Sequence, residues 1–266
     1  MFRSFDVALS GLRSHQNYID VTGNNIANVN SDGFKTSKAL FEDTLTALAR
    51  GTNMQPQPQP NGAINAAMVG LGVRTFGVQG EFQQGPFKIT NIATDMGIQG
   101  EGYFVLRGAN GPVYTRNGNF TFDANGTLRA GDGKPVLGVD NRPLTAPAGS
   151  SQPTKLSINQ SGEVVATTGQ TQTIVGTIQL ARFTNDIGLE RVGNTEFRQT
   201  VASGAPISGV AGTNGLGDLI SGVTEASNVD LGNELSNLIM AQRGFSASAK
   251  VMTTTDELVD RINQMK

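Results

Sequence analysis

The sequence predicts an α+β protein, in which N- and C-terminal helices form a coiled-coil-like core domain and short antiparallel strands form a β-rich middle domain. Two observations lead to this prediction. Apolar residues recur at helical spacing at both ends of the 266-residue chain, whereas the middle consists of short apolar runs separated by turn residues. Glycine supplies 34 residues and the hydrophobic share is only 37%, a composition that favours many turns over a thick core.

The first helix is expected over about residues 3–29, and Gly33 is expected to mark its end. Apolar residues spaced seven apart, the repeat of a coiled-coil seam, are Phe5, Leu12, Ile19 and Ile26. Polar residues such as His15 and Thr22 occupy intermediate positions, so this seam is only partly apolar.

The last helix is expected over about residues 230–263, where apolar residues alternate at spacings of three and four. Gly232 and Gly244 each weaken it by about 1 kcal/mol relative to alanine, so packing must hold it together. We expect the core helix seam, and with it the subunit interface, to comprise Phe5, Leu12, Ile19, Ile26, Leu235, Leu238, Phe245 and Met252.

Neither helix has a helical neighbour in sequence, and an isolated amphipathic helix is marginal in water. The two apolar stripes must therefore be buried against each other, against the β region, or against other copies of the chain. A Pro/Gln spacer at residues 54–62, "MQPQPQPNG", cannot be helical and favours the first and third options.

The middle of the chain, from about residue 68 to 222, is predicted to form short strands. Strands are expected at 103–106, 113–115 and 120–122, and Asn125-Gly126 is a hairpin turn. The predicted domain organisation is therefore a discontinuous helical core domain, a connecting region and a β-rich outer domain. The helical core domain comprises residues 1–30 and 228–266, the connecting region comprises residues 31–85, and the outer domain comprises residues 86–227.

Several classes of function are disfavoured. A net charge of −2 gives no electrostatic case for nucleic acid, and no apolar run reaches the length of a membrane span. The N-terminus lacks the apolar region of a cleavable secretory signal. Cysteine is absent, His15 is the only histidine, and "DANGTLRAGDGK" departs from a calcium loop at Leu128 and Lys134. We therefore expect no catalytic residue, no metal and no cofactor.

The segment "NNIANVNSDGFK" is unusually rich in amides, with Asn24, Asn25, Asn28 and Asn30 close together. One interpretation is a helix that ends in a turn, where Asn and Gly are expected. The other is that these amides form hydrogen bonds between identical subunits, because an amide both donates and accepts. We expect the four asparagines to be inter-subunit amides.

Four segments in this order resemble the bacterial flagellar rod and hook protein family. The first, at residues 10–45, contains the signature "NNIANVNSDGFK". The second, at 69–106, ends in "QGEGYFVL"; the third, at 114–138, begins "YTRNGNF" and is similar to the next hairpin of the family. The fourth, at 225–262, begins "EASNVDL" and is similar to its C-terminal helix.

This resemblance implies a structural subunit of the flagellum with no catalytic activity. "SNVDL" followed by "AQRGFSASAKVMTTTDEL" is closer to the hook pattern, so we expect a short hook protein that polymerises into a flexible universal joint. The alternative is a distal rod subunit of the rigid drive shaft in the basal body. The implied partners are many copies of the chain, adjacent rod and hook-filament junction proteins, the hook cap and the flagellar type III export apparatus. An alternative from another class is a monomeric extracellular β-domain binding module.

Overall fold

The computed structural model describes residues 2–44, 46–50, 67–145, 155–168 and 171–265. These residues form two compact units. Unit 1 combines residues 1–26, 37–79 and 231–266, and unit 2 combines residues 27–36 and 80–230. The chain therefore passes between the units four times.

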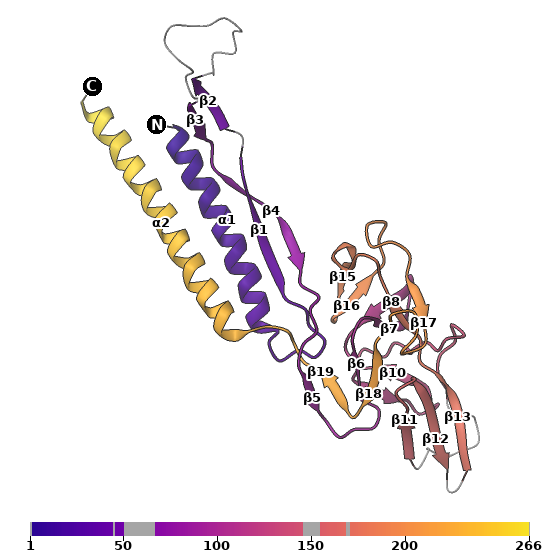
Figure 1. The fold of residues 1–266 in the computed structure, drawn as a ribbon. Coiled ribbons are helices and arrows are strands. Elements are labelled where there is room, and N and C mark those ends of the chain that lie inside the picture. The colour runs from indigo at the N-terminus through magenta and orange to yellow at the C-terminus, as the bar shows by residue number, and fades with distance from the viewer. Residues whose placement is uncertain (1, 45, 51–66, 146–154, 169–170, 266) are drawn as a thin grey trace, which may run out of the picture. The chain divides into compact units, whose positions relative to one another are not determined.

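Unit 1 contains the two long helices and four strands. In Figure 1 the helices lie side by side and run in opposite directions, and β1 and β4 lie beside α1. Strand β1 pairs with β4, and β2 pairs with β3. The elements are α1 (Phe2–Ala27), β1 (Ser37–Asp43), β2 (Thr46–Arg50), β3 (Ala67–Gly70), β4 (Val73–Gly80) and α2 (Leu231–Gln264).

Unit 2 is built from short antiparallel strands. A six-stranded sheet has the order β15-β16-β8-β7-β14-β17, a three-stranded sheet has the order β11-β12-β13, and three further pairs are β9–β10, β6–β18 and β5–β19. The elements are β5 (Phe87–Ile89), β6 (Met96–Gln99), β7 (Tyr103–Gly108), β8 (Gly111–Thr115), β9 (Phe120–Phe122), β10 (Leu128–Ala130), β11 (Lys155–Ile158), β12 (Glu163–Thr168), β13 (Thr171–Thr177), β14 (Leu180–Arg182), the 3-10 helix η1 (Asp186–Gly188), β15 (Glu190–Gly193), β16 (Glu196–Arg198), β17 (Ile207–Gly209), β18 (Asp218–Ser221) and β19 (Val223–Glu225).

Strand β7 lies between the two hydrophobic clusters of unit 2. Its side chains alternate between the faces of the sheet, as those of any strand do. Phe104 and Leu106 join a mainly aliphatic cluster, whereas Tyr103 and Val105 join an aromatic-rich one. The four consecutive buried residues of β7 therefore reflect a strand that is covered on both faces.

The expected α+β class is confirmed. Both helices occur within two residues of their expected bounds, and the hairpin β9–β10 turns at Gly126, which has φ 74°. The expected connecting region at 31–85 is divided differently, because residues 37–79 belong to unit 1 and carry β1 to β4. The expected Pro/Gln spacer at 54–62 lies outside the described residues.

Candidate assembly interface

Two glycines, Gly11 and Gly244, lie where α1 and α2 meet. A Cβ atom added to Gly11 would lie 3.0 Å from Oγ of Ser248, and one added to Gly244 would lie 2.4 Å from Cε1 of His15. Ala8 on α1 and Ala241 on α2 are fully buried nearby. The two glycines therefore leave room for the Ser248 and His15 side chains of the facing helix.

The residues of the predicted apolar seam are half-buried, with one exception. On α1 the buried positions are Ala8, Gly11, Ser14, Thr22 and Asn25, whereas all four predicted seam residues are half-buried. On α2, Leu238, Phe245 and Met252 are half-buried, but Leu235 is 46% exposed. The heptad pattern correctly predicted a helix. The role of its large residues as the core helix seam and subunit interface stays a prediction. The half-buried residues on α1 are Phe5, Leu12, Ile19 and Ile26.

The asparagines near the end of α1 have different environments. Asn25 is buried, its Nδ2 donates to the carbonyl oxygen of Ser37 at 2.8 Å, and its Oδ1 accepts from the Ser37 N–H at 3.0 Å. Asn25 therefore binds β1 of its own chain, and its inter-subunit role stays a prediction. Oδ1 of Asn28 accepts from Oγ of Ser31 at 3.0 Å within the turn. Asn24 and Asn30 are exposed, and for them the inter-subunit role stays a prediction.

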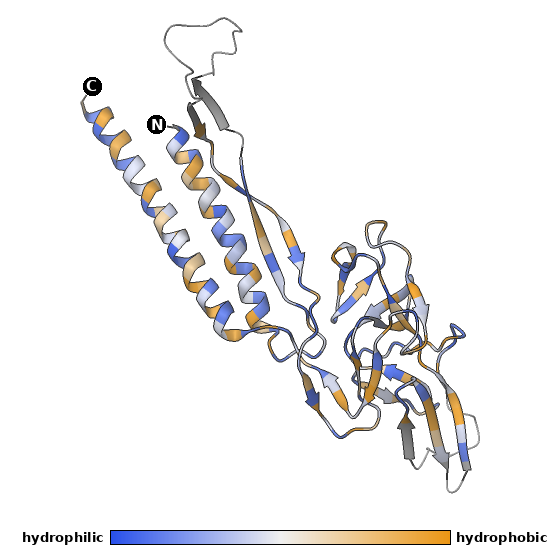
Figure 2. Ribbon diagram, viewed as in Figure 1, coloured by the Kyte–Doolittle hydropathy of each residue, from blue (hydrophilic) through white to orange (hydrophobic). Residues whose placement is uncertain are grey.

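Most of the apolar surface of α2 remains exposed. Only Ala241 and Thr255 are buried along its 34 residues. Fully burying one leucine or isoleucine side chain stabilises a protein by about 1.5–3 kcal/mol, so this surface favours association. Figure 2 shows the hydrophobic residues distributed along α2. The exposed large apolar residues of α2 are Leu231, Leu235, Ile239, Met240, Val251, Leu258, Val259 and Ile262.

The pair β1–β4 also carries exposed apolar side chains. Phe76 and Val78 on β4 are 70% and 57% exposed, and Leu40 on β1 is 37% exposed. The ion pair between Arg74 and Glu42, with NH2 and Oε2 2.8 Å apart, lies on the same two strands. An exposed apolar patch with a polar rim is typical of a protein–protein contact.

Polar and aromatic contacts hold the strand pair β1–β4 against α1. The ring of Phe41 lies 5.6 Å from that of Tyr18 in an edge-on arrangement. Nδ2 of Asn17 donates to Oγ1 of Thr75 at 3.2 Å. Burial, followed by the charge of Glu234, raises the pKa of the Tyr18 hydroxyl. These contacts leave the apolar residues Leu40, Phe76 and Val78 available to other molecules.

Unit 2 contains a buried ion cluster formed by Lys35, Glu225 and Arg116. Nζ of Lys35 lies 2.5 Å from Oε1 of Glu225, and NH1 of Arg116 donates to Oε2 of Glu225 at 3.2 Å. The Lys35 ammonium also donates to the carbonyl oxygen of Gln83 at 2.7 Å, and the Gly85 N–H donates to Oε1 of Glu225 at 2.9 Å. Burial lowers the pKa of Lys35, and the Glu225 carboxylate partly opposes that shift.

The cluster joins segments that are far apart in sequence. Lys35 belongs to "DGFK", Arg116 to "TRNG" and Glu225 to "EASN", so three of the four segments that carry the family resemblance supply its charges. Asn228 reinforces the connection, since its Oδ1 accepts from the Thr36 N–H at 2.8 Å and its Nδ2 donates to the Glu81 carbonyl oxygen at 2.9 Å. Three of the four passages between the units, at 36/37, 79/80 and 230/231, lie within six residues of these contacts.

Gly33 allows the first of these segments to enter the cluster. Its φ of 71° lies in the left-handed region, and an added Cβ would lie 2.5 Å from the backbone nitrogen of Asn117. Its N–H donates to the carbonyl oxygen of Glu225 at 2.7 Å. The sequence identified Gly33 only as a helix-ending residue. Lys35, Arg116 and Glu225 were missed because nothing in one sequence pairs charges that lie more than a hundred residues apart.

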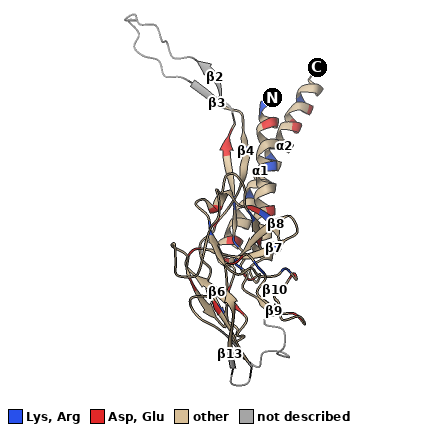
Figure 3. Ribbon diagram, turned by 90° about the vertical axis from the view of Figure 1, so that its right-hand side faces the viewer, with Lys and Arg blue, Asp and Glu red and all other residues tan. Residues whose placement is uncertain are grey.

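Charges on the helices do not form a surface of one sign. Acidic and basic residues are interspersed along α1 and α2 (Figure 3). None of the helices in the described ranges is both long and apolar enough to cross a membrane. Within the same ranges, no three acidic or histidine side chains are grouped as they would be to hold a metal ion.

Comparison with known proteins identifies the class. The family described as "Flagella basal body rod protein" matches residues 5–35, "Flagellar hook protein FlgE/F/G D1 domain" matches 97–166, and "Flagellar basal body rod FlgEFG protein C-terminal" matches 220–265. The chain is 36% identical to flagellar basal-body rod protein FlgG of Bacillus subtilis over the full length of both chains. It is 37% identical to FlgG of Caulobacter vibrioides over 97% of each chain.

A hook protein is a more distant relative. Flagellar hook protein FlgE of Borreliella burgdorferi is 24% identical in an alignment of 443 residues that covers both chains fully. Terminal helices, a β-rich middle unit and these matches define a structural protein of the bacterial flagellum. The chain belongs to the flagellar rod and hook protein family. The more similar relatives are named as rod proteins, which favours the alternative expectation over the hook.

Proposed function

We propose that this protein is a distal rod subunit, which polymerises into a rigid tube that transmits motor torque. The observation that carries the proposal is the exposed apolar surface of α2 and of β1–β4. A helix of 34 residues with two buried side chains gains little from its own chain, and further copies would bury the rest. Head-to-tail contacts that do not close on themselves produce a helical polymer.

A rod function is preferred to a hook function because of the length of the alignments as well as the sequence identity. Two relatives named FlgG align over 97% or more of each chain at 36% and 37% identity. The hook relative requires a 443-residue alignment, which is far longer than the 266 residues of this chain. The sequence preference for hook rested on two short segments near the C-terminal helix, and the whole-length similarity outweighs them.

A drive shaft needs subunits that resist deformation, and unit 2 has features that suit this role. Strand β7 is packed on both faces, and the ion cluster of Lys35, Arg116 and Glu225 fixes three distant segments. A buried charge that loses its partner is strongly unfavourable, so such a cluster opposes local opening. We expect the partners to be other copies of the chain, adjacent rod proteins and the flagellar type III export apparatus.

The experiment is assembly of the purified full-length chain, followed by electron microscopy. Straight, rigid tubes are expected, whereas curved and flexible tubes would support the hook function instead. The variant Ile239→Asp should prevent assembly, because it places a charge on an exposed apolar position of α2 without disturbing the buried contact. The matched control is Ile174→Asp in unit 2, where the side chain is 66% exposed.

A monomeric binding module makes the opposite prediction. In that case the wild-type chain would remain monomeric at high concentration, and Ile239→Asp would behave as the wild type. Circular dichroism of both variants is needed, so that a loss of assembly is not confused with a loss of helix.

A further inference from the structure

Strand β15 carries an arginine that binds the chain segment between α1 and β1. NH2 of Arg191 donates to the carbonyl oxygens of Lys35, at 2.7 Å, and Thr36, at 3.1 Å. Its Cζ atom also lies 5.6 Å from the ring centroid of Phe34 and 5.8 Å from that of Phe197. A guanidinium group is planar and delocalised, so it can donate in its plane while its faces lie against aromatic rings. Arg191 therefore holds three consecutive residues of this segment.

The segment that follows β4 is bound at the same place. The Glu81 N–H donates to the carbonyl oxygen of Thr36 at 2.9 Å, so this oxygen accepts from both Glu81 and Arg191. A Cβ atom added to Gly80 would lie 3.1 Å from NH2 of Arg191 and 2.9 Å from Cε2 of Phe82. Glycine at position 80 therefore leaves room for the guanidinium group.

Asn228 connects the third segment, which leads into α2. Its Oδ1 accepts from the Thr36 N–H at 2.8 Å, and its Nδ2 donates to the carbonyl oxygens of Glu81 and Gln83 at 2.9 Å and 3.1 Å. The oxygen and both N–H groups of this carboxamide are therefore used. Unit 2 ends or begins on these segments at residues 36, 80 and 230, so the contacts tie three of the four passages together inside unit 2.

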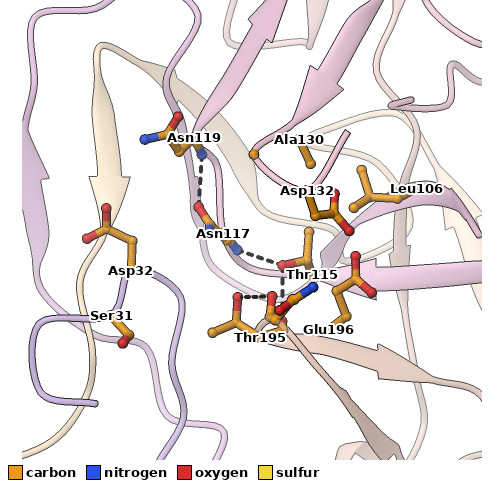
Figure 4. A pocket seen from close by; sticks show the side chains of 12 residues that line it. Ser31, Asp32, Leu106, Thr115, Asn117, Asn119, Ala130, Asp132, Thr195 and Glu196 are labelled. Carbon is orange, nitrogen blue, oxygen red and sulfur yellow. Dashed lines mark hydrogen bonds between the residues drawn. The ribbon is translucent and has the colours of Figure 1, made fainter. Parts of the chain in front are cut away.

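The hairpin that carries Arg191 is itself fixed to the six-stranded sheet, since β16 pairs with β8. At its turn, Asn194 and Thr195 have φ of 51° and 58°, as a two-residue hairpin turn requires. The Thr115 hydroxyl donates to the carbonyl oxygen of Thr195 at 3.1 Å and accepts from the Asn117 N–H at 3.0 Å (Figure 4). Arg191 therefore reaches the three segments from an anchored element.

We propose that Arg191 and Asn228 form a clamp that positions these three segments and thereby sets the bending stiffness of the assembled tube. The inference rests on the proposed function, in which each subunit transmits torque as part of a rigid tube. A hinge needs a few residues whose φ and ψ can change. Here such a change in one segment would break hydrogen bonds to the other two, so the clamp opposes it.

The position of Arg191 favours this role over a general contribution to stability. Arg191 is exposed on an edge strand of the six-stranded sheet. Exposed side chains contribute little to the free energy of unfolding of a whole domain, whereas the loss of a hydrogen bond loosens the groups that shared it. Replacing Arg191 should therefore change local opening and stiffness but not the unfolding midpoint.

The first arm of the test measures amide hydrogen exchange in the free full-length chain. In Arg191→Gln, the amides of Thr36 and Glu81 should exchange about two- to tenfold faster than in the wild type. The amides of β7 should be unchanged. The matched control is Arg198→Gln on the neighbouring strand β16, where NH1 of Arg198 lies 3.7 Å from Oε2 of Glu190. This control should leave both amides at the wild-type rate.

The second arm measures the persistence length of assembled tubes in electron micrographs. It should be shorter in Arg191→Gln than in Arg198→Gln, while the thermal unfolding midpoints of the two variants stay equal. Arg191→Lys keeps the charge but not the planar fork, and it takes the place of Arg191→Gln if that variant does not assemble.

Wild-type exchange rates at Thr36 and Glu81 in Arg191→Gln would overturn the clamp. Equal persistence lengths in the Arg191 variant and the Arg198 control would overturn its effect on stiffness. Wild-type tubes that are curved and flexible would instead contradict the proposed rod function, and the comparison of the two variants would still decide whether the clamp stiffens the tube.

Discussion

Nζ of Lys35 lies 2.5 Å from Oε1 of Glu225, and both side chains are 1% exposed, although 190 positions separate the two residues. The pair fixes the segment that follows α1 to the segment that precedes α2. Arg116 completes the cluster from the middle of the chain. A charge pair this deeply buried is sensitive to the loss of either partner.

Replacing Lys35 by methionine should destabilise unit 2 by about 3 kcal/mol, because it leaves part of the Glu225 charge buried without its partner. Urea unfolding followed by tyrosine fluorescence measures this, since Tyr103 and Tyr114 lie in the aromatic cluster of unit 2. The control is Lys88→Met, at an exposed position of β5. Equal unfolding midpoints for the two variants would refute a stabilising role for the cluster.

Two glycine substitutions should have opposite effects on the helical unit. Gly23→Ala should stabilise α1 by up to about 1 kcal/mol, because an added Cβ meets nothing within 4 Å. Gly244→Ala should destabilise the helix pair despite the same gain in propensity, since its Cβ would lie 2.4 Å from the ring of His15. Thermal unfolding of the free chain measures both changes. Stabilisation by Gly244→Ala would show that the two helices are not in close contact.

Replacing Asn25 by alanine should cost about 1–3 kcal/mol, because the backbone N–H and carbonyl oxygen of Ser37 both lose their partner. Amide hydrogen exchange at Ser37 should become faster. Asn30→Ala, at an exposed position, should leave that rate unchanged. If the Asn25 variant exchanged normally in the free chain and failed only in assembly, the result would support the inter-subunit role instead.

The hairpin β9–β10 should be sensitive to acid. The hydrogen bond from Arg129 Nε to Oδ2 of Asp123, at 2.6 Å, is the main cause that lowers the pKa of Asp123 below its ordinary value of 3.8. A carboxyl group whose pKa is lower in the folded state contributes stability above pH 3.8, and this contribution is lost as the pH falls through the folded pKa.

The wild type should therefore be more stable than Asp123→Asn at pH 6, and the difference should shrink below pH 3.8. Thermal unfolding across this range is the measurement, with Asp140→Asn as the matched change of charge in an exposed turn. A difference that stays constant down to low pH would contradict the ion pair with Arg129.

Local patterns predicted the elements of this fold but not their contacts. The seven-residue spacing of Phe5 and Leu12 identified α1, and Asn125-Gly126 identified the hairpin, because both signals arise within a few residues. The part that Gly11 and Gly244 play in the helix contact was not predicted because glycine gives no apolar signal, although side chains of the facing helix pack against both.

The ion cluster could not be predicted from the sequence, for a different reason. Lys35 and Glu225 lie in segments that carry the family resemblance, but a contact between residues 190 positions apart depends on the folded topology. The resemblance was correct about the family. Within that family the sequence preferred the hook on two short segments, whereas the relatives that align over the whole length favour the rod alternative.

The central claim is that further copies of the chain cover the exposed apolar surface of α2. Hydrogen exchange of α2 peptides, compared between the free chain and assembled tubes, tests it most directly. We expect fast exchange along α2 in the free chain, strong protection in the tubes, and little change in the strands of unit 2 around β7. Exchange along α2 that is equally slow in both states would contradict it.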